Sequence, residues 1–146
     1  MMKKFARVLL VTALLLSSQA FAKDLKTYFS KLQSYSSKDL VISLHHNEDA
    51  VALKTQDMLQ TIQDAVDYLM TGKENMDPAF AKELVRVSAL TFKTDPSEAA
   101  TEMLMPLYKK NKALLDNALR SLPKKDAKDL QDSLKNTERE YRGGNG

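Results

Sequence analysis

Apolar residues recur at spacings of three and four along most of this chain, which is the repeat of one face of an α-helix. The longest run, between residues 51 and 69, places Val51, Met58, Ile62 and Leu69 on one seam. Alternating runs rich in Val, Ile and Thr, which are typical of strands, are missing. The pattern predicts an all-α fold, a compact bundle of about five to six helices. We expect helices over about residues 24–35, 39–46, 48–71, 78–91, 96–122 and 123–142.

Two Asp-Pro pairs predict helix starts. In Asp77-Pro78 and Asp95-Pro96, the carboxylate can accept from the first backbone N–H groups, and proline fits the first helical position, where its missing N–H costs nothing. Glu98, three residues after Asp95, has the spacing of a capping box. Both pairs therefore indicate that a helix begins at once.

Other residues indicate where the remaining helices end or bend. Asn47 is placed to cap the helix that begins at residue 48, and Gly72 stands where a left-handed residue ends that helix. Pro106 lies inside the run 96–122 and removes one helical hydrogen bond. We therefore expect this helix to be kinked or broken near Pro106, and a last helix to open at Pro123.

Residues 1–22 have the three parts of a cleavable signal peptide. A short basic segment precedes the apolar stretch 8–16, which is too short to anchor a chain across a bilayer about 30 Å thick. The small-x-small site at residues 20–22 follows, and the basic residues are Lys3, Lys4 and Arg7. We expect a single helical domain over residues 23–142, a disordered tail over 143–146, and a periplasmic or, alternatively, secreted protein without a membrane anchor after cleavage.

Removal of this segment changes the charge of the molecule. The whole chain has 22 basic and 19 acidic residues, and three of the basic ones lie in the signal peptide, which leaves 19 of each. Nucleic-acid binding needs a surplus of positive charge, so we expect no nucleic-acid partner. The chain is cysteine-free, which excludes disulfides, thiol catalysis and a lipid-bearing cysteine.

His45 and His46 are the only histidines, and with Glu48 they are the one group suited to bind a metal. Adjacent residues on a helix point about 100° apart, so the two rings do not converge on one ion there. No nucleophile elbow or glycine-rich phosphate loop accompanies them. We therefore expect no catalytic residue, metal ligand or cofactor, and a metal-dependent enzyme that uses His45 and His46 is the least favoured interpretation.

These observations favour an exported, non-enzymatic protein that binds another protein, of the immunity, inhibitor or adaptor type. Asp57, Asp64 and Asp67 lie on the polar flank of the best-defined helix and are the expected contacts. The alternatives are a chaperone-like protein and a bundle that holds a small ligand. The seam over residues 51–69 also allows a homodimer, because a heptad-like stripe can face a second subunit.

Overall fold

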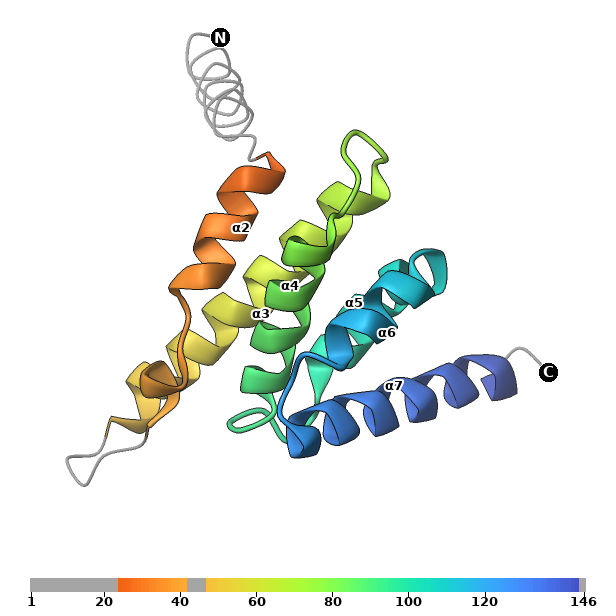
Figure 1. Ribbon diagram of the computed structural model, residues 1–146. Helices are drawn as coiled ribbons and strands as arrows, with labels where there is room; N and C mark the ends of the chain where they lie inside the picture. The colour runs from red at the N-terminus through yellow and green to blue at the C-terminus, as the bar shows by residue number, and fades with distance from the viewer. Residues whose placement is uncertain (1–23, 42–46, 145–146) are drawn as a thin grey trace, which may run out of the picture.

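The computed structural model describes residues 24–41 and 47–144, and all regular structure within these ranges is helical. The chain order is α2 (Leu25–Ser34), a 3₁₀ helix η1 (Ser37–Leu40), α3 (Glu48–Met70), α4 (Pro78–Thr91), α5 (Ala99–Lys110), α6 (Lys112–Leu119) and α7 (Lys124–Gly144). The helices pack against one another in a compact bundle (Figure 1). The predicted all-α bundle of five to six helices is confirmed.

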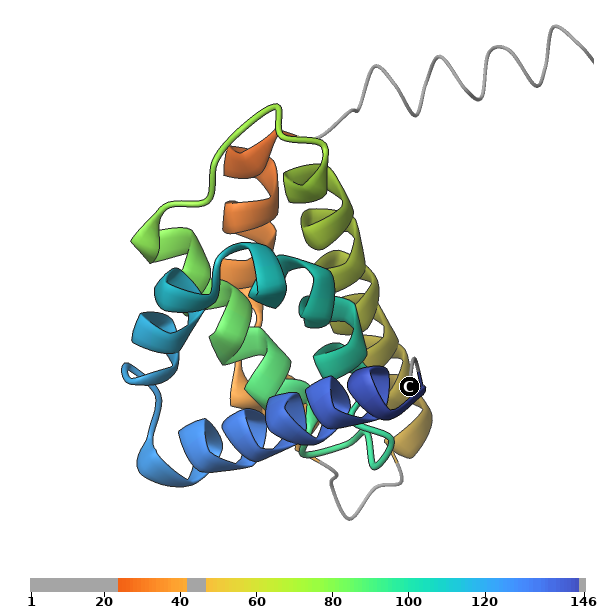
Figure 2. The same ribbon diagram turned by 90° about the vertical axis from the view of Figure 1, so that its right-hand side faces the viewer.

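Helix α3 is the longest element and packs against α2, α4 and α5. Helix α6 lies on α4, while α7 runs across α4 and α5 at the end of the bundle where those two meet (Figures 1 and 2). The largest fully buried side chains come from six helices and form one core: Leu32, Met58, Ile62, Val66, Phe80, Leu84, Leu104, Met105, Leu107, Leu115, Leu130 and Leu134.

Three helix boundaries lie where the sequence predicted them. Asp24 and Asp77 each accept a hydrogen bond from the backbone N–H three residues on, at 2.9 and 2.8 Å. Pro78 occupies the first turn of α4. Gly72 has φ +76°, a left-handed geometry that other residues adopt only with strain. These ends fix how the loop 71–77 joins α3 to α4.

The prediction that a helix starts directly at Asp95-Pro96 is wrong. The carboxylate of Asp95 accepts from the backbone N–H and hydroxyl of Ser97 and from the N–H of Ala99, which closes a turn instead. Glu98 then has φ +53°, outside the helical region, so α5 begins only at Ala99. The local side-chain bonds of Asp95 compete successfully with the helix.

The long run after residue 96 does divide, but the division lies beyond Pro106. Helix α5 continues through Pro106 to Lys110, and Asn111 leaves helical geometry at φ −129° and ψ 45°. Pro106 is exposed, so water can solvate the Glu102 carbonyl that its ring leaves without a helical donor. The break at Asn111 lets α6 turn back along α4.

Three further expectations differ in detail. Asn47 flanks α3, but its side chain donates to the Val41 carbonyl at 3.0 Å rather than capping the helix. Of the expected helix 39–46, only residues 39–40 are helical, as part of η1, and residues 42–46 lie outside the described residues. Helix α7 includes Gly143 and Gly144, beyond the predicted end at residue 142, and the Arg142–Glu138 ion pair joins its last turn to the turn before. Residues 145–146 of the expected tail are not described.

The seam of α3 faces its own chain. Val51, Met58, Ile62, Ala65 and Leu69 are all buried, together with Thr55, against the neighbouring helices. A homodimer through this seam would have to open the core. Residues on the flanks of α3 are therefore the part of this helix that remains for a partner.

Candidate functional site

The three acidic residues expected to contact a partner all lie on α3, and the structure divides them into two groups. Asp57 and Asp64 are separated by two helical turns, and Asp67 is one turn further toward the C-terminal end of α3. Asp57 is engaged within the molecule, whereas Asp64 and Asp67 flank a tyrosine at the end of the bundle.

Asp57 ties α2 to α3. The hydroxyl of the buried Tyr35 donates to the Asp57 carboxylate and also lies 2.9 Å from the Thr61 hydroxyl. Lys31 of α2 completes the group at 3.4 Å. The hydrogen bond from Tyr35 holds the pKa of Asp57 below its ordinary value of 3.8. Asp57 therefore stabilises the fold, and its carboxylate is less available for contact with a partner.

We expect Tyr35→Phe to lower the free energy of unfolding by about 1–2 kcal/mol at neutral pH, because a hydrogen bond to an ionised carboxylate is lost. Since the folded pKa of Asp57 is lowered, its contribution is present above the unfolded pKa and is lost as pH falls through the folded pKa. The difference between wild type and variant should shrink below about pH 4. Urea unfolding measured between pH 2.5 and 7 tests this.

Thr61→Val is the matched control, because it removes the second partner of Tyr35 and leaves the bond to Asp57 intact. It should keep the acid sensitivity of the wild type. An equal stability difference for Tyr35→Phe at every pH would contradict the role given to Asp57.

Asp64 and Asp67 lie beside a pair of tyrosines. The rings of Tyr28 from α2 and Tyr68 from α3 are 5.7 Å apart and tilted by 46°. Burial raises the pKa of Tyr28, and the negative charges of Asp64 and Asp67 raise it further. Gln60 and Gln63 donate to the two carboxylates at 2.8 Å, which fixes them on the helix surface. Two acids thus stand next to two half-buried aromatic rings.

The tyrosine pair continues into the loop between α3 and α4. The Tyr68 hydroxyl donates to Glu74 at 2.6 Å, and the backbone N–H of Leu25 donates to the same oxygen at 2.9 Å. The bond to Glu74 raises the pKa of Tyr68 to about 12. Glu74 thereby joins the start of α2, the end of α3 and the loop that leads to α4.

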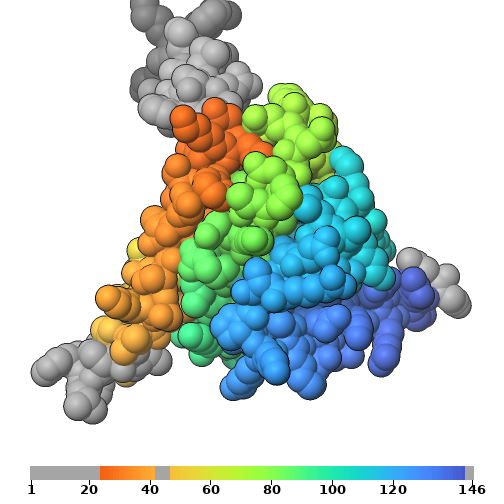
Figure 3. Space-filling view, in the orientation of Figure 1, coloured from red at the N-terminus to blue at the C-terminus, as the bar shows by residue number. Residues whose placement is uncertain are grey.

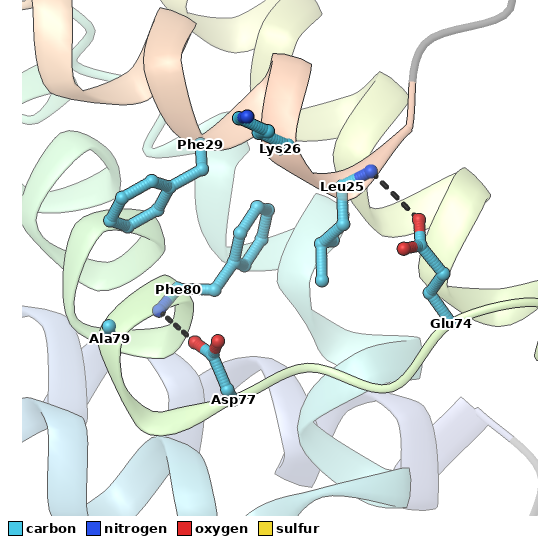
Figure 4. Close-up of a pocket in the computed structure, with 7 residues that line it drawn as sticks. All are labelled: Leu25, Lys26, Phe29, Glu74, Asp77, Ala79 and Phe80. Atoms are coloured by element: carbon cyan, nitrogen blue, oxygen red, sulfur yellow. Dashed lines mark hydrogen bonds between the residues drawn. The ribbon is translucent and has the colours of Figure 1, made fainter.

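An open pocket lies directly beside Glu74 (Figure 4). Its volume is about 310 Å³. In Figure 4 the rings of Phe29 and Phe80 face one another, 6.2 Å apart between centroids, and Leu25 points into the space beside them. We call this hollow the α2–α4 pocket; it is lined by Leu25, Lys26, Phe29, Glu74, Asp77, Ala79 and Phe80.

These features share one end of the bundle, where α2 begins, α3 ends and α4 begins. The starts of α2 and α4 and the loop after α3 lie together at the top of Figure 3. Among the described residues of this end, five acids outnumber the basic residues Lys26 and Lys73. We call it the acidic end and define it by these acids: Asp24, Asp64, Asp67, Glu74 and Asp77.

A second set of hollows surrounds Phe92, at the other end of α4. Three pockets of about 150 to 340 Å³ meet at this half-buried ring. Their rims mix the two signs of charge, with Lys93 and Lys125 beside Asp126 and Asp129. Phe92 separates the hollows, and the charges do not favour one kind of partner. The acidic end is the better defined site.

Metal binding finds no support in the part of the chain that the structure describes, where no three His, Cys, Asp or Glu side chains are grouped to hold an ion. His45 and His46 lie outside these residues, so the metal-dependent alternative receives no structural description. Within residues 24–41 and 47–144, no helix is long and apolar enough to cross a membrane.

Comparisons of the chain with protein-family models, with curated protein sequences and with solved structures give no match. The functional argument therefore depends on the geometry of the acidic end alone.

The sequence indicated part of this site and missed the rest. Asp64 and Asp67 were expected contacts, whereas Leu25, Phe29 and Phe80 have the spacing of ordinary core residues. Only the tertiary structure shows that the packing of α2 against α4 leaves a hollow between them. Glu74, a charged residue in the short loop after Gly72, was the one sequence signal that could have pointed here.

Proposed function

We propose that the chain is an exported, non-enzymatic helical protein that binds another protein through its acidic end, as an immunity, inhibitor or adaptor protein does. The observation that supports this most is the link through Glu74, which lines the α2–α4 pocket and also accepts from the hydroxyl of Tyr68. The Tyr68 ring contacts Tyr28, which feels the charges of Asp64 and Asp67. Tyrosines beside a pocket that a partner's side chain can fill are typical of the residues that dominate protein interfaces. The periplasm is the compartment that the signal-like segment favours.

A bundle that holds a small ligand is the second candidate, and the pocket itself favours it. Its volume of about 310 Å³ lies at the lower end of the range of about 300–1,000 Å³ for small-molecule sites. The pocket opens at the surface instead of enclosing its contents, which suits a protruding side chain better than a small molecule. We therefore rank protein binding first.

Photo-crosslinking tests the proposal in cells of the source organism. A photoreactive amino acid at exposed Lys73, in the acidic end, should give an adduct with one protein of defined mass. The same amino acid at exposed Lys135, on α7, should give none. Asp64→Asn with Asp67→Asn keeps the acceptors for Gln60 and Gln63 but removes two charges. We expect this double variant to reduce the Lys73 adduct about threefold or more.

Equal adducts at both positions, or no adduct at Lys73, would overturn binding through this end. An unchanged adduct in the double variant would mean that the two aspartates do not contact the partner, while the rest of the acidic end still does.

A further inference from the structure

We propose that the α2–α4 pocket receives one aromatic or large aliphatic side chain of the partner, and that basic residues flank this side chain. This inference rests on the proposed function and deepens it, because it gives the chemistry of the contact. The expected partner is a protein with an apolar residue that projects from a positively charged surface.

The walls of the pocket determine the central side chain. Leu25 and Phe29 from α2 and Ala79 and Phe80 from α4 present carbon atoms to the hollow. An apolar cavity of about 150 Å³ holds a benzene molecule, so the pocket, at about 310 Å³, accommodates a phenylalanine or leucine side chain together with part of its backbone. Burial of such a side chain contributes about 1.5–3 kcal/mol.

The rim determines the flanking residues. Glu74 and Asp77 both line the pocket, and Asp24 caps the helix that begins at Leu25. Asp77 uses one oxygen to accept from the Phe80 N–H, and Glu74 uses one oxygen for both of its bonds. Within the described residues, the other oxygen of each carboxylate takes no part in these bonds, and we assign it to a cation of the partner. Among the described residues that line the pocket, the two acids Glu74 and Asp77 stand against one basic residue, Lys26.

The hydrogen bonds also explain why the pocket is formed in advance. Glu74 fixes Leu25 through its backbone, and Asp77 fixes Phe80 through its backbone. Both acids of the rim therefore hold the apolar wall in place while they supply charge. A ligand that enters such a preformed site loses less free energy to ordering than one that has to shape it.

The probe is the peptide acetyl-Lys-Phe-Lys-amide, titrated into ¹⁵N-labelled protein and followed by amide chemical shifts. We expect shifts concentrated at Leu25, Ala79 and Phe80. Acetyl-Lys-Ala-Lys-amide should bind about tenfold more weakly, because the apolar anchor is lost. Acetyl-Glu-Phe-Glu-amide should also bind more weakly, by about threefold or more. Equal affinities for the lysine and glutamate peptides overturn the inference.

Two variants test the site from the protein side. Glu74→Gln with Asp77→Asn keeps every hydrogen bond described above and removes both charges, so the lysine peptide should bind about threefold more weakly. Ala79→Met fills the pocket from an exposed position on the first turn of α4 and should abolish the shifts. An unchanged affinity in either variant, with an unchanged melting temperature, overturns the inference. A co-purified small molecule that the peptide fails to displace overturns it as well.

These results separate the inference from the proposed function. If Ala79→Met leaves the Lys73 crosslink intact, the partner binds at the acidic end without the pocket, and only the inference fails. If the peptide binds as expected while no crosslink forms, the pocket recognises this chemistry but the proposed protein partner is wrong.

Discussion

Replacing Phe80 by alanine should lower the free energy of unfolding by about 3–5 kcal/mol, the cost that buried phenylalanines show in protein cores. Phe80 is only 1% exposed and packs against Phe29 and the rest of the core. Its backbone bond to Asp77 stays intact in the variant, so the loss comes from the side chain alone. Since domains of this size are stable by about 5–15 kcal/mol, the variant should be close to the limit of folding.

Urea unfolding followed by far-ultraviolet circular dichroism measures this effect. Phe29→Ala is the matched control, because Phe29 is half-buried and contacts the same ring from the other side. It should cost less than Phe80→Ala. Phe80→Leu should cost less than about 1.5 kcal/mol and serves if the alanine variant does not fold. A loss below about 1 kcal/mol for Phe80→Ala would mean that this wall of the pocket is not tightly packed.

Arg86→Ala should lower the free energy of unfolding by about 2–3 kcal/mol, through loss of charge-assisted hydrogen bonds. The guanidinium of Arg86, on α4, donates to the carbonyls of Leu32 and Tyr35 at 2.9 Å each, and its Nε lies 2.7 Å from Glu83. The two carbonyls lie at the C-terminal end of α2, where helical donors run out, and the Leu32 carbonyl accepts otherwise from the Tyr35 N–H at 3.3 Å. Arg86 therefore secures the C-terminal end of α2 on α4.

Hydrogen exchange distinguishes this role from a general loss of stability. A ten-residue helix is unstable alone in water, so amides of α2 should exchange faster than those of α3 in the variant. Arg86→Lys is the control, because a lysine supplies one ammonium group in place of the planar fork and should recover less than half of the loss. Uniform acceleration across α2 and α3 would contradict a specific attachment of α2.

The sequence predicted this fold well wherever one residue decides the local geometry. The left-handed turn at Gly72 and the capped start at Asp77-Pro78 depend on properties of those residues alone. The helical periodicity likewise predicted the buried seam of α3, because a stripe so apolar has to be covered. Such features need no knowledge of the tertiary structure.

The errors occur where two local interactions compete. At Asp95-Pro96 the sequence fits a helix start, yet the Asp95 side chain forms a turn with Ser97, and α5 begins at Ala99. Near Pro106 the predicted division into two successive helices is confirmed, but it lies at Asn111, because exposure to solvent makes the missing bond of Pro106 tolerable. Which local interaction forms depends in each case on how α5 packs against α3 and α4. The local sequence carries no information about this packing.

The site was the least predictable part for the same reason. A polar flank is visible in the sequence, so Asp64 and Asp67 could be proposed as contacts. The engagement of Asp57 with Tyr35 joins residues 22 positions apart, and Glu74 bonds a backbone group 49 positions away. Pairings at such separations follow from helix packing and have no signature in spacing.

The carboxylate-bound tyrosines have a consequence at the alkaline end of the pH scale. The hydroxyls of Tyr35, Tyr68 and Tyr108 each donate to a carboxylate, and burial or these bonds raise their pKa values above the ordinary 10. A raised folded pKa gives stability that is complete below pH 10 and is lost as pH rises through the raised value. Ionisation of these three tyrosines and unfolding of the bundle should therefore occur together in strong base. Their share of the ultraviolet phenolate absorption then reports unfolding in a chain that has no tryptophan.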